Sequence, residues 1–419
     1  MAPTQPRHCV VIGAGVLGAS VAARLAGSGA RVTLLEQDQP GRATSRWSFA
    51  WLNSNDKSPR PYHDLNHAGI RAWADLAPDL DGAAWYRPVG NIELATSPAA
   101  RTELAARVRR LASWNYDARL VDPAEAVELE PSLRLPEPGT IEPGTIEPGT
   151  IQRGTMAAWF PGEGYLLTEP LIARLVAQAR KRGAEIRTGE RGRVVGLDPA
   201  PDPSRPARVR TADGAVLAAD EVICCAGRWV PELAALAGAA NTIPLVPWDT
   251  PGATAPGLVV QVGPVSPAGP TRLVHTPGIC LRPHPGGLLH LEAPDAAVDL
   301  HTPDPDLRRW AAELLRRANQ TVHGLDQARV VGYQVCVRPM PVDGQSIVGR
   351  LPGAPGLYVA VTHSAVTLAA HLSQLIAAEL AAGTQRTQPT QPTELAPYRP
   401  SRFLSAATQD QPGRQDQPG

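Results

Sequence analysis

Four residues near the start of the chain have the types and spacing that bind a dinucleotide. Gly13, Gly15 and Gly18 follow a β-branched run at 10–12 and open a stretch of small apolar residues. We expect a tight turn at the first glycine, close approach of the backbone to a pyrophosphate at the second, and close helix–strand packing at the third. Glu36 ends the next β-branched run, where a carboxylate accepts hydrogen bonds from a ribose. This order predicts a site for FAD or NAD rather than NADP; the alternative is an ordinary βαβ unit whose glycines serve packing alone.

Two later segments have small or hydroxyl residues that suit contact with a cofactor. The polar turn at 40–48 carries Thr44 and Ser45, whose hydroxyls could reach a diphosphate or a flavin edge. Ala226 and Gly227 end an apolar run, so the backbone there could lie flat against a ring. For the turn, a solvated loop is the alternative.

Helical and strand patterns alternate along the chain, which predicts an α/β fold. The apolar spacing predicts helices over 62–76, 99–114, 169–182, 307–318 and 366–381. The segment 236–291 is rich in proline, which favours edge strands and turns over long helices. A chain of 419 residues is long enough for two domains.

Composition narrows the partners and the compartment. The formal net charge is zero, so neither nucleic acid nor an anionic membrane is the expected partner. Five cysteines without C-x-x-C spacing support neither a disulfide framework nor a zinc site. The longest apolar stretch, 356–382, is interrupted by polar residues such as His363 and Glu379, so we expect no membrane span. Without an apolar signal region at the N-terminus, we expect a cytoplasmic protein.

Three further features receive structural explanations. His63 and His67 have the spacing of a metal pair, but no third ligand stands nearby, so we expect helix-surface histidines and no metal. Three tandem Glu-Pro-Gly-Thr-Ile units at 137–151 predict a surface loop without chemistry. The tail at 405–419 has the composition of a disordered segment.

With these motifs placed, the chain resembles the family of glycine oxidase, D-amino-acid oxidase and dehydrogenase, and monomeric sarcosine oxidase. The resemblance runs from about residue 8 to 403 and rests on five features in the family's order. They are the Gly13/Gly15/Gly18/Glu36 fingerprint, Gly164-Tyr165, Ala226-Gly227, Arg338-Pro339 with Asp343-Gly344, and Thr362-His363-Ser364 leading to Thr367-Leu368.

The resemblance implies FAD, held in a Rossmann-type domain and roofed by a mostly antiparallel β-sheet that forms the substrate domain. We expect a discontinuous FAD-binding domain from 1–55, 158–235 and 330–404, and a substrate domain from 56–157 and 236–329. The residues expected at the cofactor are Gly13, Gly15, Val16, Gly18, Glu36, Gln37, Thr44, Ser45, Val194, Ala226, Gly227, Cys336, His363, Ser364, Ala365, Val366 and Thr367.

Arg338 matches the family's carboxylate-binding arginine, a role suited to a planar guanidinium that keeps its charge. An ordinary salt bridge is the alternative. The turn 363–367 matches the segment whose backbone amides face the flavin pyrimidine ring. Ala365 stands where the family often has glycine or arginine, so this chain departs from the pattern there.

Two positions have competing interpretations. Cys336 matches the cysteine that tethers flavin covalently in sarcosine-oxidase-like members, although cysteine is also a common core residue. His290 falls near the family's oxygen-activating lysine, where a histidine could supply positive charge or only line the pocket.

The resemblance implies an FAD-dependent oxidase of a glycine-like or N-substituted amino acid, with hydride transfer to flavin, imine hydrolysis and reduction of O2 to H2O2. A dehydrogenase that passes electrons to a quinone or carrier, and a non-catalytic flavin subunit, are the alternatives. No second cationic clamp is apparent in the sequence, which argues against dicarboxylate substrates. The sequence leaves the substrate and the oligomeric state open.

Overall fold

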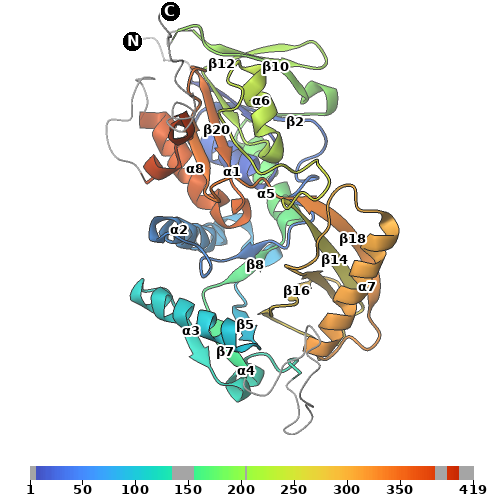
Figure 1. Cartoon of the computed structure of the whole chain (residues 1–419). Coiled ribbons are helices and arrows are strands. Elements are labelled where there is room, and N and C mark those ends of the chain that lie inside the picture. Colours follow the sequence, from blue (N-terminus) through green and yellow to red (C-terminus); the bar gives the residue numbers. More distant parts are fainter. Residues whose placement is uncertain (1–5, 135–154, 203–204, 383–393, 405–419) are drawn as a thin grey trace, which may run out of the picture.

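The computed structural model describes residues 6–134, 155–202, 205–382 and 394–404. The Glu-Pro-Gly-Thr-Ile units and the tail at 405–419 lie outside these residues. Figure 1 shows a mainly parallel sheet in the upper part of the molecule and an antiparallel sheet in the lower part. The predicted α/β class is therefore confirmed.

The upper sheet has the strand order β19-β20-β13-β1-β2-β9, and all neighbours are parallel except β19 and β20. Its strands are β1 (His8–Ile12), β2 (Arg31–Glu36), β9 (Glu185–Thr188), β13 (Glu221–Cys224), β19 (Ile347–Arg350) and β20 (Leu357–Val361). Segments far apart in the sequence thus meet in one sheet, with β1 at its centre.

Both faces of this sheet are buried, because its strands are apolar without alternation. Cys9 and Val11 pack with α1 (Val16–Gly27), α5 (Thr168–Lys181) and α8 (Ala365–Ala382). Val10 and Ile12 point the other way, toward a small sheet and the short helix α6 (Val230–Leu236). The small sheet consists of β10 (Val194–Asp198), β11 (Ala207–Thr211) and β12 (Val216–Ala219).

Helix α8 is long and apolar enough by length and composition to cross a membrane, and 44% of its span is buried. It packs against α1 and against α2 (Arg60–Leu76). Leu368, Leu372 and Ile376 are fully buried in this contact region. These contacts are those of a core helix.

The lower sheet has the order β18-β14-β17-β16-β15-β5-β7-β6, with one parallel pair, β15 and β5. Its strands are β5 (Asn91–Ala95), β6 (Arg119–Val121), β7 (Met156–Phe160), β14 (Pro256–Gly263), β15 (Leu273–His275), β16 (Cys280–His284), β17 (Leu288–Glu292) and β18 (Arg329–Val337). Helices α3 (Pro98–Ser113), α4 (Pro123–Leu129) and α7 (Asp304–Thr321) pack on it.

The two faces of the lower sheet differ, because successive side chains in a strand point to opposite sides. Leu258, Val260 and Leu291 pack with Leu314 of α7 in one core. The other face carries residues of the opposite parity, and we call it the roof face. The pairings Gly257–Cys336, Gln261–His290 and Cys280–Glu292 place Cys336, Arg338, His290 and Glu292 on it.

The expectation of edge strands in the proline-rich segment 236–291 is wrong. Strands β14, β17, β16 and β15 all lie in the interior of the lower sheet. Most prolines of this segment lie in its connections, and Pro283 lies in β16 beyond the last residue that pairs with β15. The missing N–H of Pro283 therefore breaks no ladder there.

The remaining elements connect the two sheets. A three-stranded sheet combines β3 (Trp51–Leu52), β8 (Gly164–Leu166) and β4 (Tyr86–Arg87). Short 3₁₀ helices occupy Pro78–Leu80, Gly82–Ala84, Gly189–Arg191, Gly227–Trp229, Ala396–Tyr398 and Pro400–Phe403.

The division into domains stays a prediction, but the strands can be placed against it. Every strand of the upper sheet falls within the segments expected to bind FAD. Strand β18 also falls almost wholly within one of them, yet it pairs with β14 in the lower sheet. Residues 330–337 thus lie on the substrate side of the molecule.

Candidate active site

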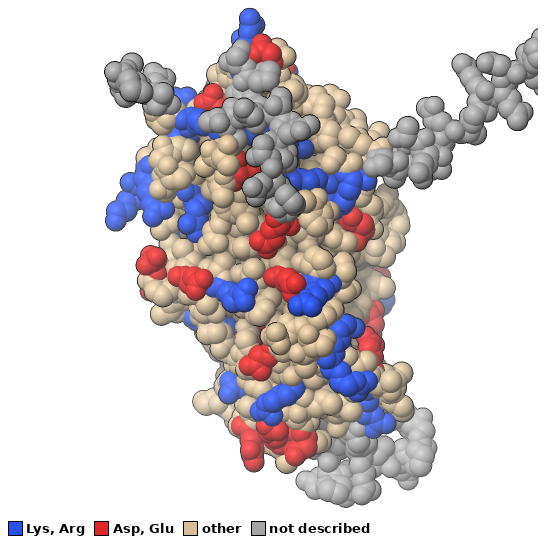
Figure 2. All heavy atoms as spheres, turned by 90° about the vertical axis from the view of Figure 1, so that its left-hand side faces the viewer, with Lys and Arg blue, Asp and Glu red and all other residues tan. Residues whose placement is uncertain are grey.

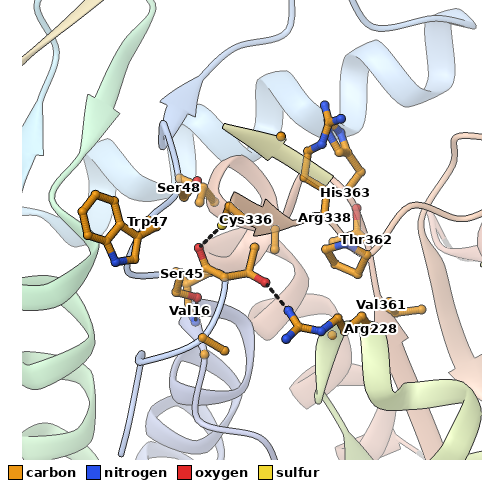
Figure 3. A pocket seen from close by; sticks show the side chains of 18 of the residues that line it. Val16, Ser45, Trp47, Ser48, Arg228, Cys336, Arg338, Val361, Thr362 and His363 are labelled. Carbon is orange, nitrogen blue, oxygen red and sulfur yellow. Dashed lines mark hydrogen bonds between the residues drawn. The ribbon is translucent and has the colours of Figure 1, made fainter. Parts of the chain in front are cut away.

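A cavity of about 1060 Å³ lies between the upper sheet and the roof face. Its walls come from the glycine turn after β1, the turn 42–51, the ends of β13 and β20, and strands β14 and β18. Figure 3 shows residues from these segments pointing toward one another across the cavity. A cavity between two domains at the carboxyl ends of parallel strands is a common place for a ligand.

The glycine turn has the shape that a dinucleotide requires. Gly13 has a φ of +94°, and a Cβ there would lie 2.8 Å from the Cys225 carbonyl oxygen. A Cβ on Gly18 would overlap the Gly13 carbonyl oxygen, so only glycine lets α1 pack this closely on the turn. The Val16 N–H, at the start of α1, donates to Ser45 Oγ at 3.1 Å. The first turn of the helix therefore opens onto the cavity, as an anion-binding helix terminus does.

Glu36 lies at the end of β2 and lines the same cavity. Its carboxylate accepts hydrogen bonds from Ala14 N at 2.8 Å and Asp38 N at 3.1 Å. Burial raises its pKa above the ordinary range, and the backbone bonds oppose that rise. The carboxylate is thereby fixed beside the glycine turn, where a ribose hydroxyl can donate to it.

Most of the residues expected at the cofactor or substrate line this one cavity. They are Gly13, Gly15, Val16, Glu36, Gln37, Thr44, Ser45, Val194, Ala226, Gly227, Cys336, Arg338, His363, Ser364, Ala365, Val366 and Thr367. Gly18 and His290 are not among the lining residues: Gly18 packs behind the turn, and His290 lies behind Trp47.

Arg338 follows β18 and points into the cavity from the roof side (Figure 3). Its Nε donates to the Ala255 carbonyl at 3.0 Å, and Nη2 donates to the carbonyls of Thr254 and Pro256 at 2.9 and 3.3 Å. Among the described residues, no acid forms an ion pair with this guanidinium. Its charge is therefore available to an anionic ligand.

His363 precedes α8 and lies near Arg338 in the cavity wall (Figure 3). Burial, together with the nearby charges of Lys57 and Arg338, lowers its pKa to about 4. The imidazole is thus neutral at physiological pH, and positive charge in this part of the cavity comes from Lys57 and Arg338.

Cys336 also lines the cavity. It lies two residues before Arg338 and on the same face of the sheet. Its thiol donates to the Thr44 carbonyl at 3.4 Å, and Arg228 Nη1 donates to the Thr44 hydroxyl at 3.4 Å. Burial raises the pKa of Cys336 to about 12, so the sulfur is a protonated thiol. Figure 3 shows Cys336 and Arg228 on opposite sides of the turn that carries Thr44.

The idea that His290 supplies positive charge does not agree with its surroundings. Burial and the neighbouring Arg282 and His284 lower its pKa to about 2. The ring nitrogens face Gln261 Nε2 at 3.1 Å and Arg282 Nη2 at 2.6 Å, and the ring stacks on Trp47. A neutral histidine carries no charge of its own, and here it accepts a hydrogen bond from Arg282 of the neighbouring strand.

Besides Arg338, the cations Arg42, Lys57 and Arg228 line the cavity, which corrects the expectation that no second one exists. Lys57 Nζ lies 2.8 Å from an Asp56 carboxylate oxygen, and both residues line the cavity. One signal in the sequence could have found it: Lys57 is one of two lysines, with Lys181, in a chain that otherwise uses arginine. Because Asp56 compensates its charge, Lys57 is a weaker anion site than Arg338.

The expectation that the histidines of α2 lie on the helix surface is wrong for His63, which is fully buried. No group of three or more potential metal ligands occurs in the described ranges. His63 Nδ1 lies 2.9 Å from the Ser54 hydroxyl and 2.7 Å from the Ser54 carbonyl oxygen. Burial lowers the pKa values of both His63 and His67.

The doubly covered parallel sheet, the glycine turn with Glu36 and the roofed cavity define a dinucleotide-binding protein. The sequence model of the FAD-dependent oxidoreductase family (DAO) matches residues 8–379. The chain belongs to this family, and its cofactor is FAD.

Relatives of known sequence are similar over most of the chain. The uncharacterized oxidoreductase YurR of Bacillus subtilis is 26% identical over 94% of this chain and 99% of its own length. Glycine oxidase of Geobacillus kaustophilus is 24% identical over 86% of this chain and 88% of its own. Mouse mitochondrial dimethylglycine dehydrogenase is 26% identical over 57% of this chain but only a quarter of its own length.

A solved structure confirms the fold. Iminodiacetate oxidase from Chelativorans sp. BNC1 superposes with a TM-score of 0.72 at 23% identity, and the match covers 94% of this chain and 98% of that one.

The residues present fit FAD. The missing Cβ atoms of Gly13 and Gly15, the open N-terminus of α1 and the carboxylate of Glu36 form a cradle for the adenosine diphosphate half. The turn 363–367 and the roof residues Cys336 and Arg338 surround the rest of the cavity. When bound, FAD supplies the two-electron acceptor.

Proposed function

We propose that this protein is an oxidase that breaks a C–N bond of a glycine-like or N-substituted amino acid. The observation that carries the proposal is the guanidinium of Arg338, which enters the cavity from the roof opposite the dinucleotide cradle. A substrate carboxylate held there would place the adjacent α-carbon between the roof and the cofactor.

Arg338 suits this role because its own geometry is fixed. Three backbone carbonyls of residues 254–256 hold Nε and Nη2, so the side chain loses little freedom when an anion binds. Nη1 has no hydrogen-bond partner among the residues that the structure describes. A carboxylate at this edge would gain a charge-assisted hydrogen bond.

The overall reaction follows from the chemistry of such a substrate. The amino acid loses two electrons and two protons and becomes an imine, which water hydrolyses to an oxo acid and an amine. O2 takes up the two electrons and two protons and becomes H2O2. If the nitrogen carries a carboxymethyl group, the products are glyoxylate and a primary amine.

The similarity to glycine oxidase and to iminodiacetate oxidase supports a small carboxylate on the oxidised carbon. Iminodiacetate carries two carboxylates, and Lys57 offers a second cation in this cavity. We therefore include N-carboxymethyl amines among the candidate substrates.

A dehydrogenase is the second candidate, because one relative is a dimethylglycine dehydrogenase. Such an enzyme would oxidise the same kind of bond but pass the electrons to a carrier instead of O2. The two candidates share the substrate site and differ only in the electron acceptor.

One experiment tests the class of substrate and then the acceptor. The holoenzyme is mixed anaerobically with a panel of amino acids and N-substituted glycines, and bleaching of the flavin band is followed at about 450 nm. Bleaching by carboxylate-bearing amines supports the proposal, and no bleaching by any of them refutes it. Stoichiometric H2O2 on admission of air identifies the oxidase, whereas slow reoxidation identifies the dehydrogenase.

A further inference from the structure

Glu292, the last residue of β17, is an acid on the roof face for which the proposed reaction gives no role so far. It lies two residues beyond His290 and pairs with Cys280 of β16, so its side chain has the same orientation as the other roof residues. Both Glu292 and Arg338 line the cavity. The roof thus presents one anion and one cation to the same space.

Glu292 differs from the other acids at this end of the cavity because it is not engaged by the protein. Asp56 pairs with Lys57, Asp295 pairs with Arg317, and Asp299 accepts from the backbone of Gly252 and His301. Within the described ranges, the side chain of Glu292 forms no hydrogen bond or ion pair, and only its backbone is paired, with Cys280. Glu292 is partly exposed, on the cavity that it lines, and an unpaired carboxylate there favours a cationic ligand.

The charged and titratable groups that face Glu292 come from three strands. They are Arg338 and Cys336 on β18, Arg282 and Cys280 on β16, and His290 on β17 itself. The two thiols are protonated and the histidine is neutral. Burial raises the pKa of Glu292, and the charges of Arg338 and Arg282 oppose that rise.

We infer that Glu292 is the anionic half of the substrate site: it binds the substrate ammonium while Arg338 binds the carboxylate, and it accepts the ammonium proton. This inference rests on the proposed function and specifies how the same cavity recognises a zwitterion. A ligand with both groups satisfies both charges of the roof at once, whereas a simple carboxylate satisfies only Arg338.

The proton transfer follows from the chemistry of the amine. An amino acid carries its nitrogen as ammonium near neutral pH, and in that form the nitrogen has no lone pair to become the imine. Transfer to Glu292 breaks one N–H bond, forms one O–H bond on the carboxylate and frees the lone pair. Glu292 releases the proton to water after the product has left, which restores the starting state.

The test compares the holoenzyme with its Glu292→Gln variant, which keeps the shape of the side chain but removes the charge. The matched control is Glu128→Gln, because Glu128 is an exposed acid of α4 that does not line the cavity. The readouts are the pH profile of anaerobic flavin bleaching, the KM and kcat values for the amine, and the dissociation constant of acetate, which has a carboxylate but no amine. FAD content and Tm show whether each variant is folded.

We expect Glu292→Gln to lower kcat/KM for the amine by roughly 10- to 100-fold and to leave acetate binding unchanged or tighter. The acid limb of its pH profile should move upward by about one pH unit or more, toward the pKa of the free amine. Glu128→Gln should keep the wild-type profile.

Two results would overturn the inference. If the wild type is bleached by amines but the folded Glu292→Gln variant has the same kcat/KM and pH profile, Glu292 is not part of the site and the proposed function stands. If no amine bleaches the wild type, the proposed function fails, and the role of Glu292 fails with it.

Discussion

The guanidinium of Arg338 is held by backbone carbonyls rather than by an acid, and this determines what it can bind. Carbonyls 254–256 fix its orientation without compensating its charge. An arginine paired with an acid would have to exchange that partner for a substrate, whereas Arg338 only gains one. At this scale the site is preorganised for an anion.

Replacing Arg338 with Met should weaken the reaction with every carboxylate substrate. Arg338 is exposed in the structure, so loss of its charge-assisted contact with a carboxylate should cost about 2 kcal/mol, or roughly 30-fold in kcat/KM. The effect should fall mainly on KM, because the carboxylate is bound in both the ground and transition states. Steady-state kinetics with the best amine from the panel measures this split.

The matched control for that variant is Arg329→Met. Arg329 begins the same strand but is exposed and does not line the cavity. It should keep wild-type kinetics. Equal losses in both variants, or no loss in Arg338→Met, would remove Arg338 from the substrate site.

We expect FAD to be bound without a covalent bond to Cys336. Burial keeps this thiol protonated, and a tether requires the thiolate as nucleophile. Acid precipitation of the holoenzyme should leave the yellow colour in the supernatant, and Cys336→Ser should not change that partition. Colour that stays with the wild-type pellet but leaves the Cys336→Ser pellet would show a tether.

At the scale of elements, the packing of α1 on the glycine turn decides whether the cradle forms. In Gly18→Ala, the new Cβ would meet the Gly13 carbonyl oxygen, so helix and turn would have to separate. Overpacking of this kind costs about 2 kcal/mol. We expect a lower Tm and a loss of FAD on gel filtration, whereas Gly162→Ala, which meets nothing within 4 Å, should change neither.

The loop that carries Asp56 and Lys57 depends on a buried acid, Glu163. Its carboxylate accepts from Trp51 Nε1 at 3.0 Å, Asn55 Nδ2 at 3.0 Å, Asn91 Nδ2 at 3.1 Å and the Tyr116 hydroxyl at 2.7 Å. These bonds tie β3 and the loop after it to the lower sheet. All these partners donate, and the carboxylate oxygens accept from each of them.

Glu163→Gln should therefore destabilise the fold, because its amide N–H2 would face other donors. We expect a loss of about 3 kcal/mol in the free energy of unfolding, measured in urea, and weaker FAD binding. Glu185→Gln, an exposed acid of β9, should cost less than about 0.5 kcal/mol. Equal midpoints for the two variants would contradict this role of Glu163.

The stability of the wild type should also depend on pH through Glu163. Burial raises its pKa from the ordinary 4.5 to about 7 in the folded state. Between these values the folded chain binds more protons than the unfolded chain, so stability falls as pH rises through this window. Urea midpoints measured from pH 4.5 to 7.5 should show this slope in the wild type but not in Glu163→Gln; equal slopes would contradict it.

Local patterns predicted the elements and the cradle well, because glycine turns and amphipathic helices are encoded by neighbouring residues. Helix α5 was expected at 169–182 and spans Thr168–Lys181. The turn at Gly13 has a φ of +94°, which glycine adopts without strain, so a local residue choice permits this conformation.

The roof could not be predicted in the same way, because its geometry depends on which strands pair. Proline content suggested edges, but Pro283 lies where an interior strand outruns its neighbour. Glu292 and Lys57 carry no motif and enter the cavity only through strand register and loop position. His290 was placed near the site, but its lowered pKa depends on burial and on Arg282 across the ladder.

At the scale of the whole molecule, acidic and basic residues are mixed over the surface, and the candidate active site lies between the two sheets. Figure 2 shows acidic and basic side chains interspersed over one face, in line with the zero net charge. The cavity joins residues of the upper sheet's loops to roof residues such as Cys336 and Arg338. A ligand that fills it therefore contacts both layers.

FAD should consequently stabilise both layers, whereas ADP should stabilise only the cradle. With ADP, we expect the apoprotein to show two thermal transitions, one for the upper sheet with its helices and one for the lower sheet with its helices. The holoenzyme should show a single transition. With ligand at 100 times its Kd, binding adds about 2.7 kcal/mol to the free energy of unfolding. Calorimetry with FAD and with ADP at equal saturation measures which of the two transitions each ligand stabilises. In Gly18→Ala both ligands should lose their effect, since the cradle is shared. If ADP merged the transitions as FAD does, the layers would be coupled through the protein itself, and the cofactor would not be the link between cradle and roof.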